Sequence, residues 1–390
     1  MLDAVLRWLL QVAHQPLTTA ELLEELWPRV VDAGVPLGRA LIAVRTIHPQ
    51  LVGLGYMWRR GRGVRSDEHP HGELEQPRFL HSPLRAIFDG GPPLRLRLDG
   101  DAPLPYPVLE ELRADGMTDY LGLPLRFSNG RAQALTLTTD APAGFSGAAA
   151  AALGELAAAL ALVIEVREMR RVAVTLLDTY VGPRAGAKIL DGWIRRGDLA
   201  LIDAVVLCGD LRGFTPLTVE LAPADVVALL NQYFGAVCAP LREAGGEILK
   251  FIGDGVLVAF DVDGFARVGD ACAAALSGAE RALEALAALG ACRVGGRELP
   301  LRMGVALHVG QVAFGNVGAA SRLDFTVIGR AVNVASRLAG LCSRVERTLL
   351  VSSAFARALP DGALHVGSHS VRGLPEPEEV YTYALPRDRS

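Results

Sequence analysis

The apolar and polar positions of this chain follow two different periods, and the change of period divides it into regions. In residues 1–56 the apolar positions fit helical spacing, and Thr19 precedes the run AELLEELW as a helix N-cap. The pattern therefore predicts a small N-terminal region that is helical throughout residues 1–56.

Residues 57–170 change to the period of a β-strand. Three segments have the composition and alternation of strands: residues 94–99, 120–127 and 132–139. Asn129-Gly130 lies between the last two and is a dipeptide that favours a tight hairpin turn. Because an alanine-rich helix follows, the pattern predicts a small α+β domain that ends in a long exit helix.

The alanine-rich stretch, residues 147–164, is nearly long enough to span a membrane. Alanine adds little insertion energy, and the carboxylate of Glu155 near its middle costs about 2.5–3.5 kcal/mol in that position. We therefore expect no membrane span, but a long helix that packs against a second copy of itself. Gly182-Pro183 breaks the helical run, so residues 171–199 are expected to form linker helices.

Residues 200–390 alternate between strand-like and helix-like segments, as in an α/β domain. A strand ends at Asp210, and a helix is expected over residues 224–245. A hairpin surrounds Gly253-Asp254-Gly255, and a long alanine-rich helix runs through residues 270–289.

Composition narrows the class of protein. A chain of 390 residues is long enough for two or three domains, and a net charge of −4 gives no support to nucleic-acid binding. The five cysteines are scattered without C-x-x-C spacing. We therefore expect reduced thiols and a cytoplasmic location, without disulfides or a zinc site.

Two aspartates, Asp210 and Asp254, each end an apolar run and precede glycine or small residues. A carboxylate at the end of a buried strand is costly unless it is paired or bound to a cation. On neighbouring strands the two could hold divalent metal between them, which is the minimum apparatus for chemistry on a nucleoside triphosphate.

The segment FTVIGRAVNVASRL, residues 325–338, joins an apolar strand to a helix that carries Asn333 and Arg337 on one face. Together with the two aspartate motifs, it resembles the class III nucleotidyl cyclase catalytic domain, over roughly residues 171–385. The resemblance implies a ferredoxin-like α/β sandwich that forms a head-to-tail homodimer, with two active sites at the interface.

The resemblance also implies roles for individual residues. Asp210 and Asp254 match the metal-binding aspartates, with the Leu211 carbonyl as an added ligand of two Mg²⁺ or Mn²⁺ ions. Asn333 matches the residue that orients the ribose, and Arg337 the one that stabilises charge on the α-phosphate. The backbone after Asp210 is expected to bind phosphate, through Leu211, Gly213, Phe214 and Thr215.

Two further residues suggest the substrate. Lys250 matches a position that reaches the base of the nucleotide bound by the partner subunit, and lysine, a donor only, suits adenine N1. Its spacing of four from Asp254 would place both on one face of a strand. Thr326 matches the second base position, where its hydroxyl oxygen can accept a hydrogen bond. The Lys and Thr pair is similar to the class IIIb subgroup, some members of which respond to bicarbonate.

Some positions depart from the family pattern. Gln311 stands where some relatives have a phosphate-binding arginine, and Arg330 has no assigned role. Arg372 is placed as a replacement for the lysine that holds the β- and γ-phosphates in many relatives. No P-loop and no GGDEF-like signature is present in the sequence.

The element order of residues 57–170 resembles a GAF-like sensor domain, with an unknown small molecule as a candidate ligand. The sequence thus predicts a helical region over residues 1–56, a GAF-like domain over 57–170, a linker over 171–199 and a cyclase domain over 200–390. The predicted activity is ATP to 3′,5′-cyclic AMP and pyrophosphate. The alternatives are a guanylyl cyclase and a catalytically silent nucleotide-binding regulator.

Overall fold

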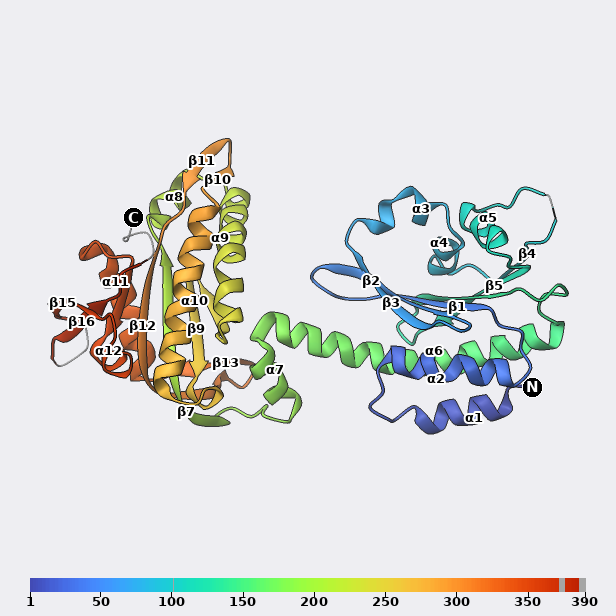
Figure 1. The fold of residues 1–390 in the computed structure, drawn as a ribbon, viewed down its shortest axis with the longest axis horizontal. Coiled ribbons are helices and arrows are strands. Elements are labelled where there is room, and N and C mark those ends of the chain that lie inside the picture. The colour runs from blue at the N-terminus through green and yellow to red at the C-terminus, as the bar shows by residue number, and fades with distance from the viewer. Residues whose placement is uncertain (101, 372–375, 386–390) are drawn as a thin grey trace. The chain divides into compact units, whose positions relative to one another are not determined.

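The computed structural model describes residues 1–100, 102–371 and 376–385, and it divides into two compact units (Figure 1). The first unit is Met1–Leu176 and the second is Leu177–Ser390. We describe each unit by itself.

The first unit is built on a six-stranded antiparallel sheet in the order β3-β2-β1-β6-β5-β4. Its strands are β1 (Arg39–Arg45), β2 (Leu51–Arg59), β3 (Gly63–Pro70), β4 (Leu94–Arg97), β5 (Asp119–Arg126) and β6 (Ala132–Thr139). One face packs on α1 (Asp3–Val12), α2 (Thr19–Asp32) and α6 (Gly147–Val181), where the main core lies. The other face carries η1 (Glu73–Glu75), α3 (Pro77–Leu80), α4 (Pro83–Phe88) and α5 (Pro107–Ala114).

The prediction that residues 1–56 are helical throughout is wrong for their second part. Residues 39–45 form β1, and β2 begins at Leu51, so the expected boundary between residues 56 and 57 falls inside a strand. A short apolar run such as RALIAVR fits the period of a helix and that of a strand equally well. Its pairing with β2 and β6 makes it a strand. The first part is helical as expected, although the N-cap of α2 is Thr18, one residue before the predicted Thr19.

The strands expected around residues 94–99, 120–127 and 132–139 are confirmed as β4, β5 and β6. The β5–β6 hairpin turns at the expected dipeptide, where Gly130 has a φ of +79°. The helix break at Gly182-Pro183 is also confirmed, because α6 ends at Val181 and α7 (Pro183–Leu190) follows.

Buried carboxylates attach α6 to the rest of the first unit. Glu165 accepts hydrogen bonds from the backbone N–H and the hydroxyl of Ser128, in the hairpin between β5 and β6. Glu168 accepts from the hydroxyls of Thr19 at 3.3 Å and Tyr56 at 3.2 Å. Because buried carboxylates are costly without such partners, these bonds fix the position of the helix along the sheet.

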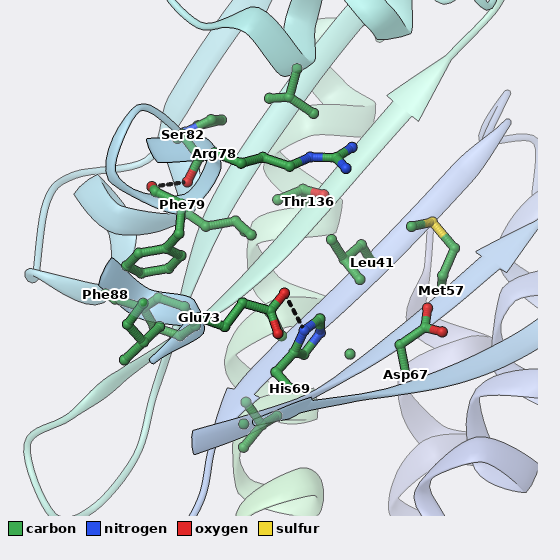
Figure 2. A pocket seen from close by; sticks show the side chains of 18 of the residues that line it. Leu41, Met57, Asp67, His69, Glu73, Arg78, Phe79, Ser82, Phe88 and Thr136 are labelled. Carbon is green, nitrogen blue, oxygen red and sulfur yellow. Dashed lines mark hydrogen bonds and ion pairs between the residues drawn. The ribbon is translucent and has the colours of Figure 1, made fainter. Parts of the chain in front are cut away.

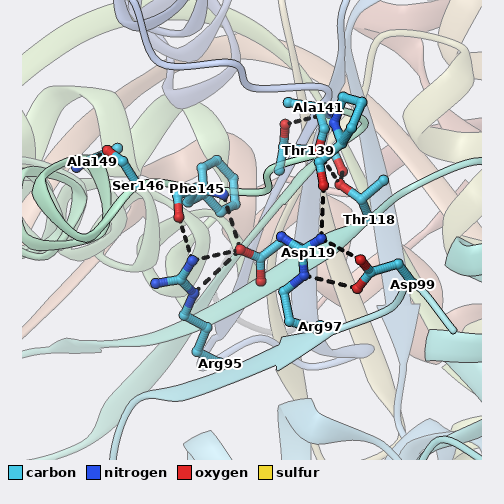
Figure 3. Close-up of polar contacts among 11 residues, drawn as sticks. Arg95, Arg97, Asp99, Thr118, Asp119, Thr139, Ala141, Phe145, Ser146 and Ala149 are labelled. Carbon is cyan, nitrogen blue, oxygen red and sulfur yellow. Dashed lines mark hydrogen bonds and ion pairs between the residues drawn. The ribbon is translucent and has the colours of Figure 1, made fainter. Parts of the chain in front are cut away.

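A third buried carboxylate, Asp119 on β5, organises the segment that leads into α6 (Figure 3). Its side chain is 0% exposed, and its Oδ2 accepts from Arg95 Nη2 at 2.8 Å and from the backbone N–H of Phe145 at 3.0 Å. Arg95 also donates to the Phe145 carbonyl. Asp119 therefore joins β4, β5 and the start of the exit helix.

Two described helices, α6 and α9 (Pro223–Glu243), are long and apolar enough to cross a membrane by length and composition. This is weak evidence for a span, because core helices have the same properties. Both helices bury one face in a core of their own unit.

The second unit contains an eight-stranded sheet in the order β15-β16-β14-β12-β7-β9-β8, with β13 paired to β12. The strands are β7 (Leu199–Leu211), β8 (Glu247–Ile252), β9 (Gly255–Asp261), β12 (Met303–Ala319), β13 (Arg322–Ile328), β14 (Leu349–Ser352), β15 (Leu364–His369) and β16 (Glu378–Thr382). A separate hairpin joins β10 (Ala291–Val294) and β11 (Arg297–Pro300). The remaining short elements are α8 (Phe214–Glu220), η2 (Val262–Gly264) and α12 (Ser353–Ala358).

Helices cover both faces of this sheet. One core contains the buried faces of α9 and α10 (Val268–Ala288), and the other contains α11 (Arg330–Arg344) with part of α7. Figure 1 shows α9 and α10 side by side along the sheet. The predicted mixed α/β fold class is confirmed, and all five cysteines are free thiols.

Replacing Asp119 tests the role of the buried network. Asp119→Ala should destabilise the protein by about 2–4 kcal/mol, because the Phe145 N–H and the Arg95 guanidinium lose their buried acceptor. Urea unfolding followed by tryptophan fluorescence measures this, because Trp8, Trp27 and Trp58 lie in the first unit.

The matched control is Asp99→Ala. Asp99 pairs with Arg97 at 2.6 Å, but the side chain of Asp99 is 53% exposed, so the unfolding midpoint should change little. Equal midpoints for the two variants would contradict the role given to Asp119.

Candidate active site

The position of Asp254 is set by a two-residue turn. β8 and β9 form an antiparallel hairpin in which Ile252 pairs with Gly255, leaving Gly253 and Asp254 as the turn. Gly253 has a φ of +63°, which a residue with a side chain rarely adopts at the first central position of such a turn. The sequence Gly-Asp-Gly therefore places one carboxylate at the tip of the hairpin.

Asp210 lies beside this turn. It is the penultimate residue of β7, which pairs with β9 from Ala204 to Gly209, and an added Cβ at Gly255 would lie 3.8 Å from Asp210 Oδ1. Partial burial, and next the charge of Asp210, raise the pKa of Asp254. The backbone of Leu211 contributes a hydrogen bond that opposes this rise. The predicted meeting of Asp210, Leu211 and Asp254 is therefore confirmed in space.

Tyr233 of α9 is buried near enough to both carboxylates for their charges to act on its phenol. It is 0% exposed, and burial together with the charges of Asp210 and Asp254 raises the pKa of its phenol. The sequence analysis missed Tyr233, because nothing in a helical apolar run marks a tyrosine as a neighbour of two distant aspartates.

The donor set suits a divalent metal. Two carboxylates this close repel each other unless a cation or a shared proton lies between them. Carboxylate and backbone carbonyl oxygens are the ligands that Mg²⁺ and Mn²⁺ prefer. Among the described residues, no three His, Cys, Asp or Glu side chains are grouped so that they could hold a metal ion. A metal at this site would therefore need substrate or water for its other ligands. The residues fit the ion, and the role of the Leu211 carbonyl stays a prediction.

Lys250 has a different neighbour from the one expected. β8 ends at Ile252 and contains an irregularity between Ile248 and Lys250, so Asp254 lies in the turn and not on a shared strand face. The prediction that even spacing places Lys250 and Asp254 on one face is therefore wrong. Lys250 Nζ instead forms an ion pair with Asp324 of β13.

Thr326 lies two residues after Asp324 on β13, so their side chains share one face of that strand. Thr326 is 6% exposed, and its hydroxyl oxygen is buried without a hydrogen-bond partner. Such a group is uncommon in a folded protein unless a ligand or partner completes it. Lys250 and Thr326 are thus brought to the same neighbourhood, and Asp324 is a third member that sequence reasoning missed.

Asn333 and Arg337 lie on α11 and face away from its buried side. That side consists of residues such as Ala331, Val334 and Leu338, whereas Asn333 is exposed and Arg337 is half-buried. The predicted sharing of one helical face is confirmed. Among the described residues, no hydrogen bond or ion pair joins either side chain to the carboxylates or to Lys250.

For the remaining predicted residues, the structure gives a location but no contact that tests their predicted roles. Gly213, with a φ of +70°, is the N-cap of α8, and Phe214 and Thr215 begin that short helix. Gln311 is exposed on β12, and Arg330 begins α11. Arg372 lies outside the described residues.

Comparison with known proteins agrees with this geometry. Residues 202–386 match the model of the family described as the adenylate and guanylate cyclase catalytic domain. The adenylate cyclase of Anabaena cylindrica is 36% identical over 155 residues, which are 40% of this chain and 30% of that protein. The terminal-differentiation specific adenylate cyclase of Dictyostelium discoideum is 27% identical over 191 residues, covering 47% of this chain and 9% of that protein.

Two solved structures are also similar to the chain. The adenylyl cyclase CyaB from P. aeruginosa is 29% identical with a TM-score of 0.43, covering 48% of this chain and 96% of that one. The guanylyl cyclase Cya2 is 29% identical with a TM-score of 0.42 and the same two coverages.

The curated relatives are longer proteins, and the matched segments span less than a third of either. The match of residues 202–386, together with the paired carboxylates and the α11 face, identifies the second unit. The second unit therefore contains, over residues 202–386, a domain that matches the adenylate and guanylate cyclase catalytic domain.

Proposed function

We propose that this chain is an adenylyl cyclase that converts ATP to 3′,5′-cyclic AMP and pyrophosphate. The observation that carries the choice of ATP is the arrangement on β13, where Asp324 pairs with Lys250 and the buried hydroxyl of Thr326, two residues later, has no hydrogen-bond partner. Adenine presents an acceptor at N1 and a donor at its amino group. The lysine donates to the first, and the threonine oxygen accepts from the second.

Guanine presents the opposite pattern, with a proton on N1 and an acceptor at O6. A lysine facing that proton would leave both donors unpaired, which is costly in a buried site. Asp324 holds the ammonium group of Lys250 on the side of β13 that carries Thr326. We propose that it positions Lys250 for the base.

The reaction joins the ribose 3′-oxygen to the α-phosphorus, breaks the bond to the β-phosphate oxygen, and releases the hydroxyl proton to solvent. Two divalent ions held by Asp210, Asp254 and the Leu211 carbonyl would supply activation of the hydroxyl and neutralisation of the phosphates. Arg337 offers a guanidinium for the charge that develops on the α-phosphate. Asn333 orients the ribose, and the backbone of Gly213, Phe214 and Thr215 binds phosphate.

We propose a head-to-tail homodimer as the active form. One chain carries the carboxylate pair, the base residues and the α11 residues, so two copies complete two sites. Exposed apolar side chains surround the base residues and would be covered by a partner: Phe251 at 51%, Ile252 at 62% and Ile328 at 46% exposure. Arg372 is kept as a proposed phosphate ligand.

A second apolar surface lies on α6. Six residues recur there at spacings of four, three, four, three and four, which is the heptad pattern of a two-stranded coiled coil: Leu162, Val166, Met169, Ala173, Leu176 and Tyr180. We call these the α6 stripe. Leu162, Val166 and Met169 are 61%, 66% and 65% exposed, respectively, so the stripe supports pairing with a second copy.

We further propose that the first unit is a GAF-like sensor that regulates the cyclase. α6 begins in this unit and continues past Leu176, so a change within the sheet has a continuous helix to act on. Five unpaired thiols support a reducing, cytoplasmic location.

The metal assignment predicts the effect of losing one carboxylate. Asp254→Asn should lower cyclic AMP formation in Mn²⁺ by on the order of a thousandfold, about 4 kcal/mol in transition-state stabilisation, and leave the oligomeric state unchanged. Asp203→Asn, at an exposed aspartate on the same strand as Asp210, should retain full activity. Substantial turnover by Asp254→Asn would refute the two-metal site, and inactivity of the unaltered chain would favour a silent regulator.

The substrate assignment predicts a change of specificity. Lys250→Glu should lower kcat/KM for ATP by roughly a hundredfold and raise the GTP-to-ATP ratio, because glutamate accepts from guanine N1. Separation of cyclic AMP and cyclic GMP products measures both rates. Lys188→Glu, on α7, is the control and should leave the ratio unchanged. Preference for GTP in the unaltered chain would favour the guanylyl cyclase alternative.

The α6 stripe predicts that charge disrupts the dimer. Val166→Glu combined with Met169→Glu should weaken dimerisation at least tenfold in sedimentation velocity, because two carboxylates per helix would enter an apolar seam. Cyclase activity should fall with the dimer fraction. Arg170→Glu, a charge reversal beside the stripe, should have a small effect, and an unaltered dimer in the double variant would exclude the α6 stripe as an interface.

A further inference from the structure

The first unit contains a cavity of about 350 Å³ on the face of its sheet opposite the main core (Figure 2). It lies between β1, β2 and the segment formed by η1, α3 and α4. Its walls are mainly apolar and include Leu41, Met57, Phe79 and Phe88. This size and lining suit a small organic molecule.

Strand alternation explains how a charged residue reaches this cavity. On β1, Ala40 and Ile42 point into the core under the helices, so Arg39 and Leu41 point to the opposite face. Arg39 is 9% exposed, and its Nε donates to Met57 Sδ at 2.8 Å. A thioether is a weak acceptor, and no carboxylate forms an ion pair with Arg39 among the described residues. The cation is therefore buried without a contacting carboxylate, although the more distant charges of Asp115 and Glu111 act on it. Burial, and next the charge of Arg59, lower its pKa to about 10.

Two unpartnered hydroxyls lie in register with Arg39. Arg39 on β1 pairs with Thr138 on β6, and Thr138 pairs with Tyr120 on β5, so the three side chains form a row across one face. Thr138 and Tyr120 are 0% and 2% exposed, respectively, and neither hydroxyl has a hydrogen-bond partner within ordinary bonding geometry. Tyr120 lines the cavity together with Thr136, whereas Thr138 is not among the lining residues. We call these residues the polar row.

The other charges near the cavity are already satisfied. Asp67 pairs with Arg65 at 2.7 Å, His69 contacts Glu73 at 2.9 Å, and Arg78 pairs with Glu111 at 3.1 Å. Figure 2 shows His69 and Glu73 facing each other at the wall.

Arg45, at the other end of β1, donates to the Phe88 carbonyl at 3.0 Å and lies 4.7 Å from the centre of the Phe88 ring. The charge that lacks any oxygen acceptor is therefore that of Arg39. An acidic ligand group beside Arg39 and Tyr120 would neutralise it and pair the Tyr120 hydroxyl.

We propose that the cavity binds a small organic anion with an aromatic or branched aliphatic body. Its carboxylate, phosphate or sulfonate group is bound by Arg39 and Tyr120, which both line the cavity, and its body occupies the apolar space lined by Leu41, Met57 and Phe79. This site is independent of the cyclase reaction, and it can be tested on the full chain without turnover.

The test uses two fluorescent probes that have similar aromatic bodies and differ in charge. Anilinonaphthalene sulfonate has an aromatic body with an acidic group, and phenylnaphthylamine has a similar body without it. Titration of the full-length chain should give saturable binding of the sulfonate. Arg39→Met should weaken sulfonate binding at least about tenfold, because it removes a charge-assisted bond, and should change phenylnaphthylamine binding less than about twofold.

Tyr120→Phe removes one hydroxyl and keeps the ring, so it tests the same site even if Arg39→Met does not fold. It should weaken sulfonate binding by about threefold to tenfold, and leave the neutral probe unaffected. Arg78→Met is the control, because this arginine also lines the cavity but is exposed and paired, and it should retain the affinity of the unaltered chain.

Three results with the sulfonate and with Tyr120→Phe would overturn the proposal, and a fourth concerns Arg78→Met. The first three are the absence of saturable sulfonate binding, unchanged sulfonate affinity in Tyr120→Phe, and equal loss of both probes in that variant. Loss of sulfonate affinity in Arg78→Met equal to that in Arg39→Met would also do so, by placing the anion at the cavity rim. None of these titrations measures cyclic nucleotide formation. A negative result for the anion site is therefore distinguishable from a negative result for the proposed cyclase activity.

Discussion

Two carboxylates held side by side against their mutual repulsion are the constraint on which the second unit depends. Asp210 ends a strand, and Asp254 occupies a turn that only a glycine at residue 253 makes easy. Burial, and next the neighbouring carboxylate charge, raise the pKa of Asp254 and that of Tyr233. The pairing of β7 with β9 holds the two carboxylates together. Carboxylates so placed repel each other unless a cation or a shared proton lies between them.

Buried polar groups without hydrogen-bond partners mark the candidate sites in both units. Most buried hydroxyls and amides of a folded chain are paired, and here the carboxylates Glu165, Glu168 and Asp119 are held by several donors each. Against that background, the hydroxyls of Thr326 and Tyr120 stand out as buried without partners. Thr326 lies beside the base-binding residues we propose, and Tyr120 lies beside an unneutralised arginine.

Local patterns predicted much of the fold. The Gly-Asp-Gly hairpin, the Asn-Gly turn and the Gly-Pro helix break depend on a few adjacent residues, so their conformations follow from sequence. The helical prediction failed at residues 39–56, where RALIAVR and its neighbours satisfy both periods. Pairing partners from β6, almost a hundred residues later, decided in favour of strands.

The sequence by itself determined the chemical types at the cyclase site, namely the two aspartates, the lysine, the threonine and the Asn–Arg face of a helix. These were recognisable because each lies within a short motif of fixed spacing. Only the tertiary structure decided which groups meet: Asp324 with Lys250, Tyr233 near the carboxylates, and Arg39 in one row with Thr138 and Tyr120. The physical reason is that strand register sets these contacts between residues distant in the chain, and register depends on the packing of the whole sheet.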